Sequence, residues 1–226
     1  MKNTLKLIGL VALSLQIACS KTADYTKYLE SGEIQYAAKP EKLKAYPGNE
    51  RIKLQWFILS DQNITKAKVY WRNKSDSLEV PITRSAGIDT ISVIIPLAEG
   101  SYSFDVVHLH ADGVKSLAAN TSSNSYGPSY ISTLLNRGVN SHSFTPTNQG
   151  IVINWGPVEG TALGTKVNYI NINNDARQFV AAPTVNSSSY TRLLQNSTLE
   201  YRTMYKPDTL SIDTFYSPIN YIPIKY

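Results

Sequence analysis

Two stretches of this chain decide its fold: Arg51-Ile52-Lys53-Leu54-Gln55-Trp56 and Gly150-Ile151-Val152-Ile153-Asn154-Trp155. In each stretch apolar side chains alternate with other residues, as expected of a β-strand that buries one face, and each stretch ends in tryptophan. The two tryptophans stand 99 positions apart, and Tyr102 and Tyr201 are separated by the same 99 positions. Equal offsets at two separate landmarks indicate an internal duplication.

Further matches extend the repeat, since residues 65–71 correspond to 165–170 and residues 100–106 to 199–205. Each copy consists of short apolar-alternating runs separated by Gly, Pro and Asn, without a helical period. The tryptophan that ends an early strand and the corner Leu97 to Tyr102 resemble the fibronectin type III pattern, of which Leu194 to Tyr201 is a looser copy. We therefore predict an all-β chain with two tandem fibronectin type III or immunoglobulin-like β-sandwiches.

The composition agrees with two small β domains in 226 residues. Charged residues make up only 17%, whereas tyrosine alone contributes 15 residues. A mean hydropathy of −0.22 excludes both wholesale disorder and a protein with many membrane spans. The single cysteine excludes a disulfide framework and any multi-thiolate metal site within one chain.

That cysteine, Cys19, follows a basic start and a short apolar segment, Leu7 to Leu15. The segment is too short to cross a bilayer as a helix, so residues 1–18 read as an export signal. Ala18-Cys19 resembles the lipobox of bacterial lipoproteins, in which the cysteine is lipidated and becomes the mature N-terminus. Gln16 departs from that pattern, and a plain secreted protein is the alternative. We expect membrane attachment through Cys19.

The rest of the chain divides into a tether at 19–40, a first sandwich with its connecting segment at 41–140 and a second sandwich at 141–226. Within the connection, Ile131 to Leu135 fits either a last strand or a short helical turn. Cleavage before Cys19 would leave 20 basic and 17 acidic residues, a net charge of +3 without any run of Lys or Arg. This balance and the export signal argue against a nucleic-acid partner.

With these features in view, the chain resembles a family of Bacteroidota outer-membrane lipoproteins with two fibronectin-like domains, often encoded beside glycan-uptake systems of the starch-utilisation type. The resemblance implies a cell-envelope context with a role beside glycan capture by a transporter complex; it supplies no catalytic or binding residues and implies no activity. Its motifs are Cys19, Tyr46 to Arg51, Val69 to Asn73, Gly100 to Phe104, Tyr126 to Tyr130, and Pro207 to Phe215.

Catalytic signatures are absent from the sequence. It contains no Gly-x-Ser-x-Gly elbow, no phosphate-binding glycine loop and no cofactor fingerprint, so we expect no enzyme and no cofactor. Asp208 with Asp213, or Asp105 with Asp112, could form a glycosidase pair, but their spacing does not favour that role. His108 and His110 share one strand face and could ligate zinc. We interpret them instead as the wetter end of an inward face, and predict no metal site.

Exposed aromatic side chains are the better route to binding, because sugar rings stack on them while nearby amides and charges bind hydroxyls. Neighbours on a strand point to opposite faces, so one of Tyr70 and Trp71 should be exposed. Trp71 with Arg72, Asn73 and Asp76 would form a shallow platform. Further candidates are Tyr126 with Tyr130, and Tyr169 with Asn171 and Asn173. Aromatic residues also favour β-sheets for packing alone.

Three Asp-Ser/Thr-hydrophobe sequences resemble the O-glycosylation signal of exported Bacteroidota proteins, with acceptors Ser77, Thr90 and Thr209 expected on surface loops. The leading hypothesis is a non-catalytic surface lipoprotein that helps a transporter capture polysaccharide. A structural or adhesive protein-interaction module is the alternative, and a hydrolase is a distant third. Only Asp24 is acidic among the residues just after Cys19. A periplasm-facing anchor therefore stays open beside the favoured cell-surface location.

Overall fold

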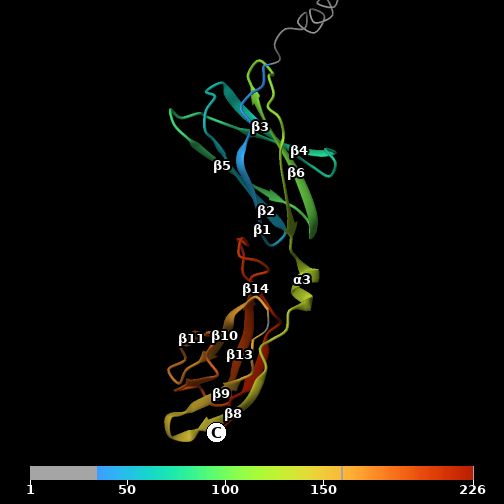
Figure 1. The fold of residues 1–226 in the computed structure, drawn as a ribbon. Helices are drawn as coiled ribbons and strands as arrows, with labels where there is room; N and C mark the ends of the chain where they lie inside the picture. The colour runs from blue at the N-terminus through green and yellow to red at the C-terminus, as the bar shows by residue number, and fades with distance from the viewer. Residues whose placement is uncertain (1–34, 159, 226) are drawn as a thin grey trace, which may run out of the picture. The chain divides into compact units, whose positions relative to one another are not determined.

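The computed structural model describes residues 35–158 and 160–225. The expected signal peptide, Cys19 and residues 19–34 of the expected tether lie outside these residues. The described chain is almost entirely β (Figure 1), with a single short α-helix. Its elements are β1 (Glu41–Pro47), β2 (Arg51–Ile58), β3 (Ile64–Trp71), β4 (Asp76–Pro81), β5 (Asp89–Pro96), β6 (Gly100–His110), β7 (Ala119–Ser125), α3 (Pro128–Thr133), β8 (Val139–Thr145), η1 (Pro146–Asn148), β9 (Gly150–Trp155), β10 (Ala162–Ile170), β11 (Ala176–Ala181), β12 (Ser187–Tyr190), β13 (Thr198–Tyr205), β14 (Phe215–Tyr216) and β15 (Asn220–Pro223).

The sheet topology is duplicated. In the first sandwich, a sheet of order β1-β2-β5 faces a sheet of order β4-β3-β6-β7. The second has the sheets β8-β9-β12 and β11-β10-β13-β14, with β15 also paired to β13. The strands β8, β9 and β12 therefore stand where β1, β2 and β5 stand, and β10, β11 and β13 where β3, β4 and β6 stand. This confirms the predicted pair of fibronectin-type sandwiches.

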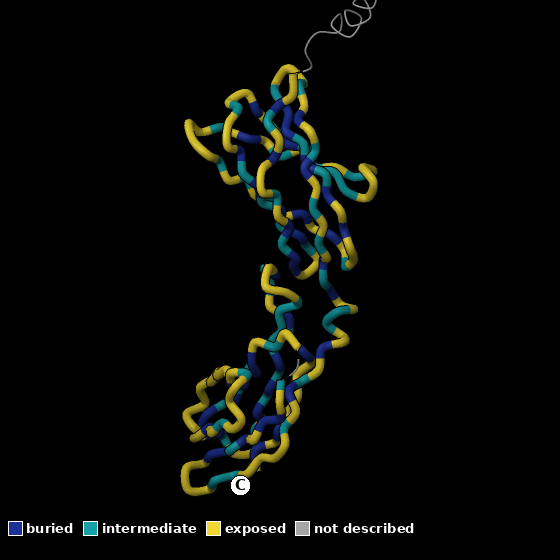
Figure 2. Tube along the Cα trace, in the orientation of Figure 1, coloured by how far each residue is buried: buried dark blue, intermediate teal, exposed yellow. Residues whose placement is uncertain are grey.

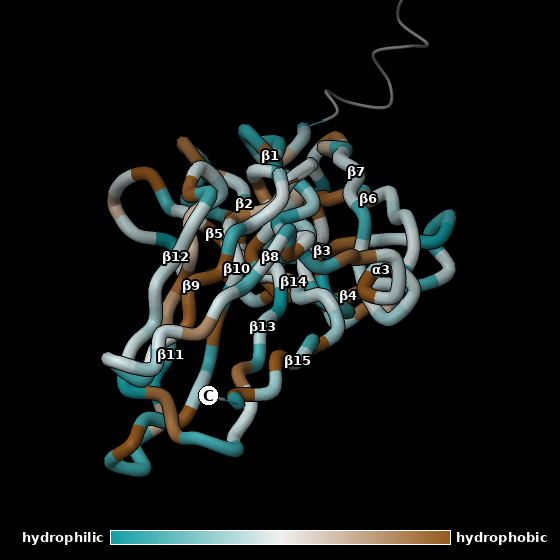
Figure 3. The backbone as a smooth tube through the Cα atoms, turned by 90° about the horizontal axis from the view of Figure 1, so that it is seen from below, coloured by the Kyte–Doolittle hydropathy of each residue, from teal (hydrophilic) through white to brown (hydrophobic). Residues whose placement is uncertain are grey.

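The alternating stretches bury one face, as their pattern predicts. Ile52, Leu54, Trp56 and Ile58 are all buried along β2, and the residues between them are half-buried. The same alternation is visible along other strands in the burial colouring (Figure 2) and in the hydropathy colouring (Figure 3). In the second sandwich, Ile151, Ile153 and Trp155 are buried on β9. Each sandwich thus has its own core.

Burial of the Trp56 indole requires an acceptor for its N–H. Trp56 Nε1 donates to His108 Nε2 at 2.9 Å, so Nε2 carries no proton. His108 Nδ1 must then carry the proton, and it donates to the Ala38 carbonyl oxygen at 2.6 Å. The Ala38 N–H in turn donates to Asp61, which also contacts His110 Nε2 at 2.8 Å. This confirms that both histidines lie on the inward face of their strand. Ala38 is held through both its N–H and its carbonyl oxygen.

In the second sandwich, the equivalent tryptophan and tyrosine form hydrogen bonds with different partners. Trp155 Nε1 donates to Ser188 Oγ at 3.0 Å. In the first copy the Tyr102 hydroxyl donates to the Ala98 carbonyl oxygen at 3.0 Å, which confirms the expected corner. In the second, the Tyr201 hydroxyl instead accepts from the Asn220 amide at 3.2 Å. The looser corner of the second copy therefore relies on β15.

The connecting segment contains α3, which settles the open choice at Ile131 in favour of a helical turn followed by an extended Leu134. The Glu99 carboxylate accepts from the N–H groups of Ser129 and Tyr130, each at 2.7 Å, and so holds the start of this helix. β8 already begins at Val139. No helix among the described residues is long and apolar enough to span a membrane.

The buried His108 predicts a pH dependence of stability. Burial lowers the pKa of His108 below the 6.5 of an exposed histidine, so the folded chain keeps it neutral. The unfolded chain gains a proton as the pH falls through 6.5, and this favours unfolding. Between pH 7.5 and pH 5.5 we expect the free energy of unfolding in urea to fall by up to about 1.4 kcal/mol from this group alone.

The substitution His108→Gln should flatten this slope, whereas His142→Gln, at an exposed position, should leave it unchanged. An NMR titration of the His108 ring in the unsubstituted chain provides a second measurement. A ring that becomes protonated near pH 6.5 in the folded state would contradict the account.

Candidate functional site

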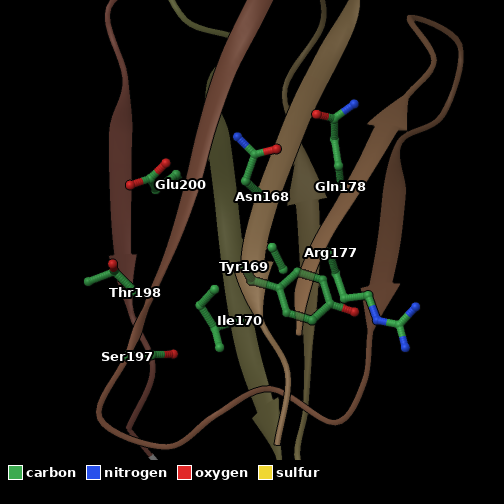
Figure 4. A pocket seen from close by; sticks show the side chains of 9 residues that line it. Asn168, Tyr169, Ile170, Arg177, Gln178, Ser197, Thr198 and Glu200 are labelled. Atoms are coloured by element: carbon green, nitrogen blue, oxygen red, sulfur yellow. The ribbon is translucent and has the colours of Figure 1, made fainter. Parts of the chain in front are cut away.

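A groove of about 640 Å³ lies on the β11-β10-β13 sheet of the second sandwich (Figure 4). The sheet presents its outer face there, because Val167, Tyr169, Leu199 and Tyr201 point into the core. The groove is lined by Asn168, Tyr169, Ile170, Ala176, Arg177, Gln178, Ser197, Thr198 and Glu200.

Strand register assembles a row of polar side chains along this groove. Asn168 on β10 is the direct partner of Gln178 on β11 and of Glu200 on β13. Glu200 is in turn the partner of Tyr221 on β15, and Tyr221 is 59% exposed. Paired residues lie on the same face of a sheet, with β-carbons about 5 Å apart. We call Gln178, Asn168, Glu200 and Tyr221 the outer row; the first three stand side by side across the strands in Figure 4.

The outer row has free hydrogen-bonding capacity. None of the side chains of Asn168, Gln178 and Glu200 forms a hydrogen bond or ion pair with a residue that the structure describes. Two amides offer donors and acceptors, the carboxylate offers acceptors, and the tyrosine offers a ring face. This combination suits a polyhydroxylated ligand. A single carboxylate without histidine or cysteine does not make a metal site, and no metal-binding cluster of such residues occurs in the described ranges.

On the corresponding outer face of the first sandwich, the polar and charged side chains pair with one another instead. Lys66 Nζ lies 3.0 Å from Glu79, and Lys68 Nζ lies 3.8 Å from the same carboxylate. Lys68 also lies over the Tyr70 ring, 5.3 Å from its centroid. Asp105 accepts from the Asn120 amide at 2.5 Å. The duplicated fold thus carries one internally paired outer face and one whose polar side chains lack protein partners.

The residues expected to form a platform lie together on the β3–β4 hairpin. Trp71 is half-buried against the first core, and Tyr70 is half-buried beneath Lys68. Arg72 pairs with Asp76 at 3.2 Å and lies over the Tyr102 ring. Asn73 is exposed in the turn, with φ of 54°. The hairpin exposes less aromatic surface than the sequence suggests, because its rings pack against their own sandwich.

Tyr126 and Tyr130 form a separate group. Their ring centroids are 4.7 Å apart, and both rings contact Phe215, at 5.8 Å and 5.2 Å. Tyr169 is buried, with its ring stacked on Phe179. Asn171 is also buried and binds Asp175 within its own turn. Much of this aromatic surface is therefore covered by neighbouring side chains.

The carboxylates considered for catalysis are already engaged. Arg51 binds Asp213 through two nitrogens, at 3.0 Å and 2.5 Å, and the Asn49 N–H donates to the same group. The Arg51 hydrogen bond lowers the pKa of Asp213, so this carboxyl is ionised and cannot serve as a proton donor near neutral pH. Asp105 is bound by Asn120 and lies 3.7 Å from Lys74.

The three O-glycosylation-like residues are all exposed, but only one lies in a loop. Thr209 is in a turn, whereas Ser77 belongs to β4 and Thr90 to β5. The expectation of loop positions was therefore wrong for Ser77 and Thr90. Both strands lie at sheet edges, which leaves outward side chains accessible without a loop.

Sequence reasoning missed all four residues of the outer row: Gln178, Asn168, Glu200 and Tyr221. The only local signal is alternation, because Asn168 lies between inward Val167 and Tyr169, and Glu200 between Leu199 and Tyr201. That pattern places single residues outward, but it does not say which strands pair. The outer row can be recognised only when the pairing register of the four strands is known.

Comparison with known proteins places the chain in a family. Residues 19–215 match the profile of DUF4998, described as a domain of unknown function. No curated protein matches the chain. Among solved structures, it is similar to the FN1–FN3 domains of chicken CNTN1, with 15% identity over 84% of this chain and 65% of that one and a TM-score of 0.46. It is also similar to a two fibronectin type III domain segment from chicken tenascin, with 12% identity over 83% of this chain and 99% of that one and a TM-score of 0.31.

Because the polar side chains of the outer row have no hydrogen-bond partners among the described residues, we expect them to contribute little to the stability of the fold. Asn168→Ala or Gln178→Ala should change the free energy of unfolding by less than about 0.5 kcal/mol. Tyr102→Phe is the contrasting variant, since it removes the hydrogen bond to Ala98 and should cost about 1 kcal/mol. Urea denaturation of the three variants measures both effects. A cost above 1 kcal/mol at Asn168 would show that the row is structural.

Proposed function

We propose that this chain, which belongs to the DUF4998 family, is a non-catalytic cell-envelope lipoprotein that captures polysaccharide for an outer-membrane uptake complex. The outer row carries the proposal, because two amides, a carboxylate and an exposed tyrosine stand together without protein partners. The sugar C–H face would stack on Tyr221, and hydroxyl groups would bind Asn168, Gln178 and Glu200.

The chemistry of the groove supports binding over catalysis. Glu200 is the only carboxylate among its lining residues, whereas glycoside hydrolysis commonly needs a pair. A shallow sheet face also suits a long ligand that extends beyond the site. In this proposal Cys19 anchors the chain to the outer membrane, at the cell surface. The partner transporter would then receive a ligand already held at the surface.

Affinity electrophoresis through gels containing polysaccharides tests this function, with the chain from Ser20 onward. Tyr221→Ala should weaken retention by the bound polysaccharide about fivefold, which corresponds to about 1 kcal/mol for a lost aromatic contact. Tyr36→Ala is the matched control, because Tyr36 is 58% exposed against 59% for Tyr221. It should leave retention unchanged.

Trp71→Ala separates the two candidate surfaces in the same gels. Retention that is weakened by Trp71→Ala and unaffected by Tyr221→Ala would move the site to the β3–β4 hairpin. A chain that is retarded by none of the polysaccharides would contradict the proposed function.

One observation favours the second candidate, a protein-interaction or adhesive module. β5 lies at the edge of its sheet, and its residues 90–95 carry no charge. An uncharged edge strand is a template for addition of a strand from another chain. Ile94 is 50% exposed there, and Ile94→Lys would block such pairing while leaving the outer row intact. Loss of partner binding in this variant alone would identify the module function.

A further inference from the structure

The next row of the same sheet face brings two cations together. Lys166 on β10 and Arg202 on β13 are direct cross-strand partners, one row from Asn168 and Glu200. Like charges in directly opposite positions destabilise a sheet. Neither cation forms an ion pair with an acid in the described part of the chain, Glu200 included. Two positive charges therefore face solvent beside the groove without a counter-charge from the described residues.

Arg202 is held in a fixed orientation. Its guanidinium carbon lies 4.1 Å from the centroid of the Tyr216 ring, which is a close cation–π contact. Arg202 Nε is buried and has no hydrogen-bond acceptor among the residues described. A donor left in this state is costly, and such groups call for an explanation. The stack restricts the guanidinium before any ligand arrives, which reduces the entropy cost of binding.

Lys166 and Arg202 lie close enough to the outer row for one ligand to contact both. Alternate residues on one face of a strand lie about 7 Å apart. Lys166 is thus one such step from Asn168, and Arg202 is one step from Glu200. Neighbouring parts of one extended ligand can therefore contact both rows. Glu200 would repel an anion placed in its own row, so the favourable position for an anion is beside Lys166 and Arg202.

We propose that Lys166 and Arg202 bind the anionic groups of an acidic polysaccharide, carboxylate or sulfate ester, whose sugar rings lie along the outer row. This inference rests on the proposed function and specifies its ligand class. Arg202 offers the planar donor pair that matches a carboxylate or sulfate, and Lys166 adds a mobile point charge. Binding is then sensitive to ionic strength, because both charges are half-exposed.

A matched pair of polymers tests the charge requirement. Polygalacturonate and its methyl-esterified form share one backbone, and only the first carries free carboxylates; dextran sulfate and dextran form the corresponding pair for sulfate. The chain from Ser20 onward should be retarded more by the charged member of at least one pair, and that pair identifies the anion. Equal retardation by both members of each pair would overturn the acidic-ligand inference while leaving glycan capture intact.

Charge variants test the residues. Lys166→Gln should weaken binding of the charged polymer about fivefold, and Lys166→Gln with Arg202→Gln roughly 25-fold if the two effects add in free energy. Lys115→Gln, at an exposed position elsewhere, removes the same charge and should change nothing. Because Arg202→Gln also removes the Tyr216 stack, Lys166→Gln alone decides the point, with melting temperatures recorded for all variants.

Two further outcomes separate the proposals. Polyglutamate retarded as strongly as the charged polysaccharide, with no effect of Tyr221→Ala on either, would show simple ion exchange and overturn the inference. The chain could also bind the neutral and the charged polymer of a pair equally well. If Tyr221→Ala then weakened this binding and Lys166→Gln did not, the acidic-ligand inference would be overturned and the proposed glycan capture would stand. Absence of binding to every polymer would overturn both proposals.

Discussion

The register of β10 with its neighbours is the constraint on which the candidate site depends. Val167 and Tyr201 are direct partners and both point inward, so their burial fixes which residues of β10 and β13 face solvent. A slip of β10 by one residue would turn Asn168 into the core while Glu200 stayed outside, and would so break up the outer row. Burying a polar side chain without a hydrogen-bond partner costs free energy, and this cost opposes the slip in addition to the loss of apolar burial. Core packing thereby determines the chemistry of the opposite face.

Duplication explains why the two copies share a fold while their outer faces differ. The inward positions keep tryptophan and tyrosine at the same offset in both copies, although the acceptor for the indole N–H is His108 in one and Ser188 in the other. The outward positions are freer to change, because a half-exposed strand face tolerates either charges or amides. In the first sandwich Glu79 is paired with two lysines, and in the second those positions lack such pairs.

The sequence was sufficient for the fold and insufficient for the site. The alternation of apolar residues that ends at Trp56 and at Trp155 predicts strands with one buried face. The corner before Tyr102 predicts the hydrogen bond from the Tyr102 hydroxyl to the Ala98 carbonyl oxygen. The strand pattern around Trp71 does not show that its ring packs back on its own core. The outer row joins residues from 168 to 221, and pairing over such distances depends on tertiary structure. The irregular β14 and β15 gave no strand signal to locate Tyr221.

The most direct measurement is an amide chemical-shift titration of the isotope-labelled chain with short oligosaccharides prepared from the polysaccharide that it binds. The account predicts shifts concentrated at 166–170, 176–180, 198–202 and 220–223, which are the strands of one outer face. Shifts concentrated at 70–76 on the β3–β4 hairpin, or shifts spread evenly over both sandwiches, would contradict the assignment of the site to the second sandwich.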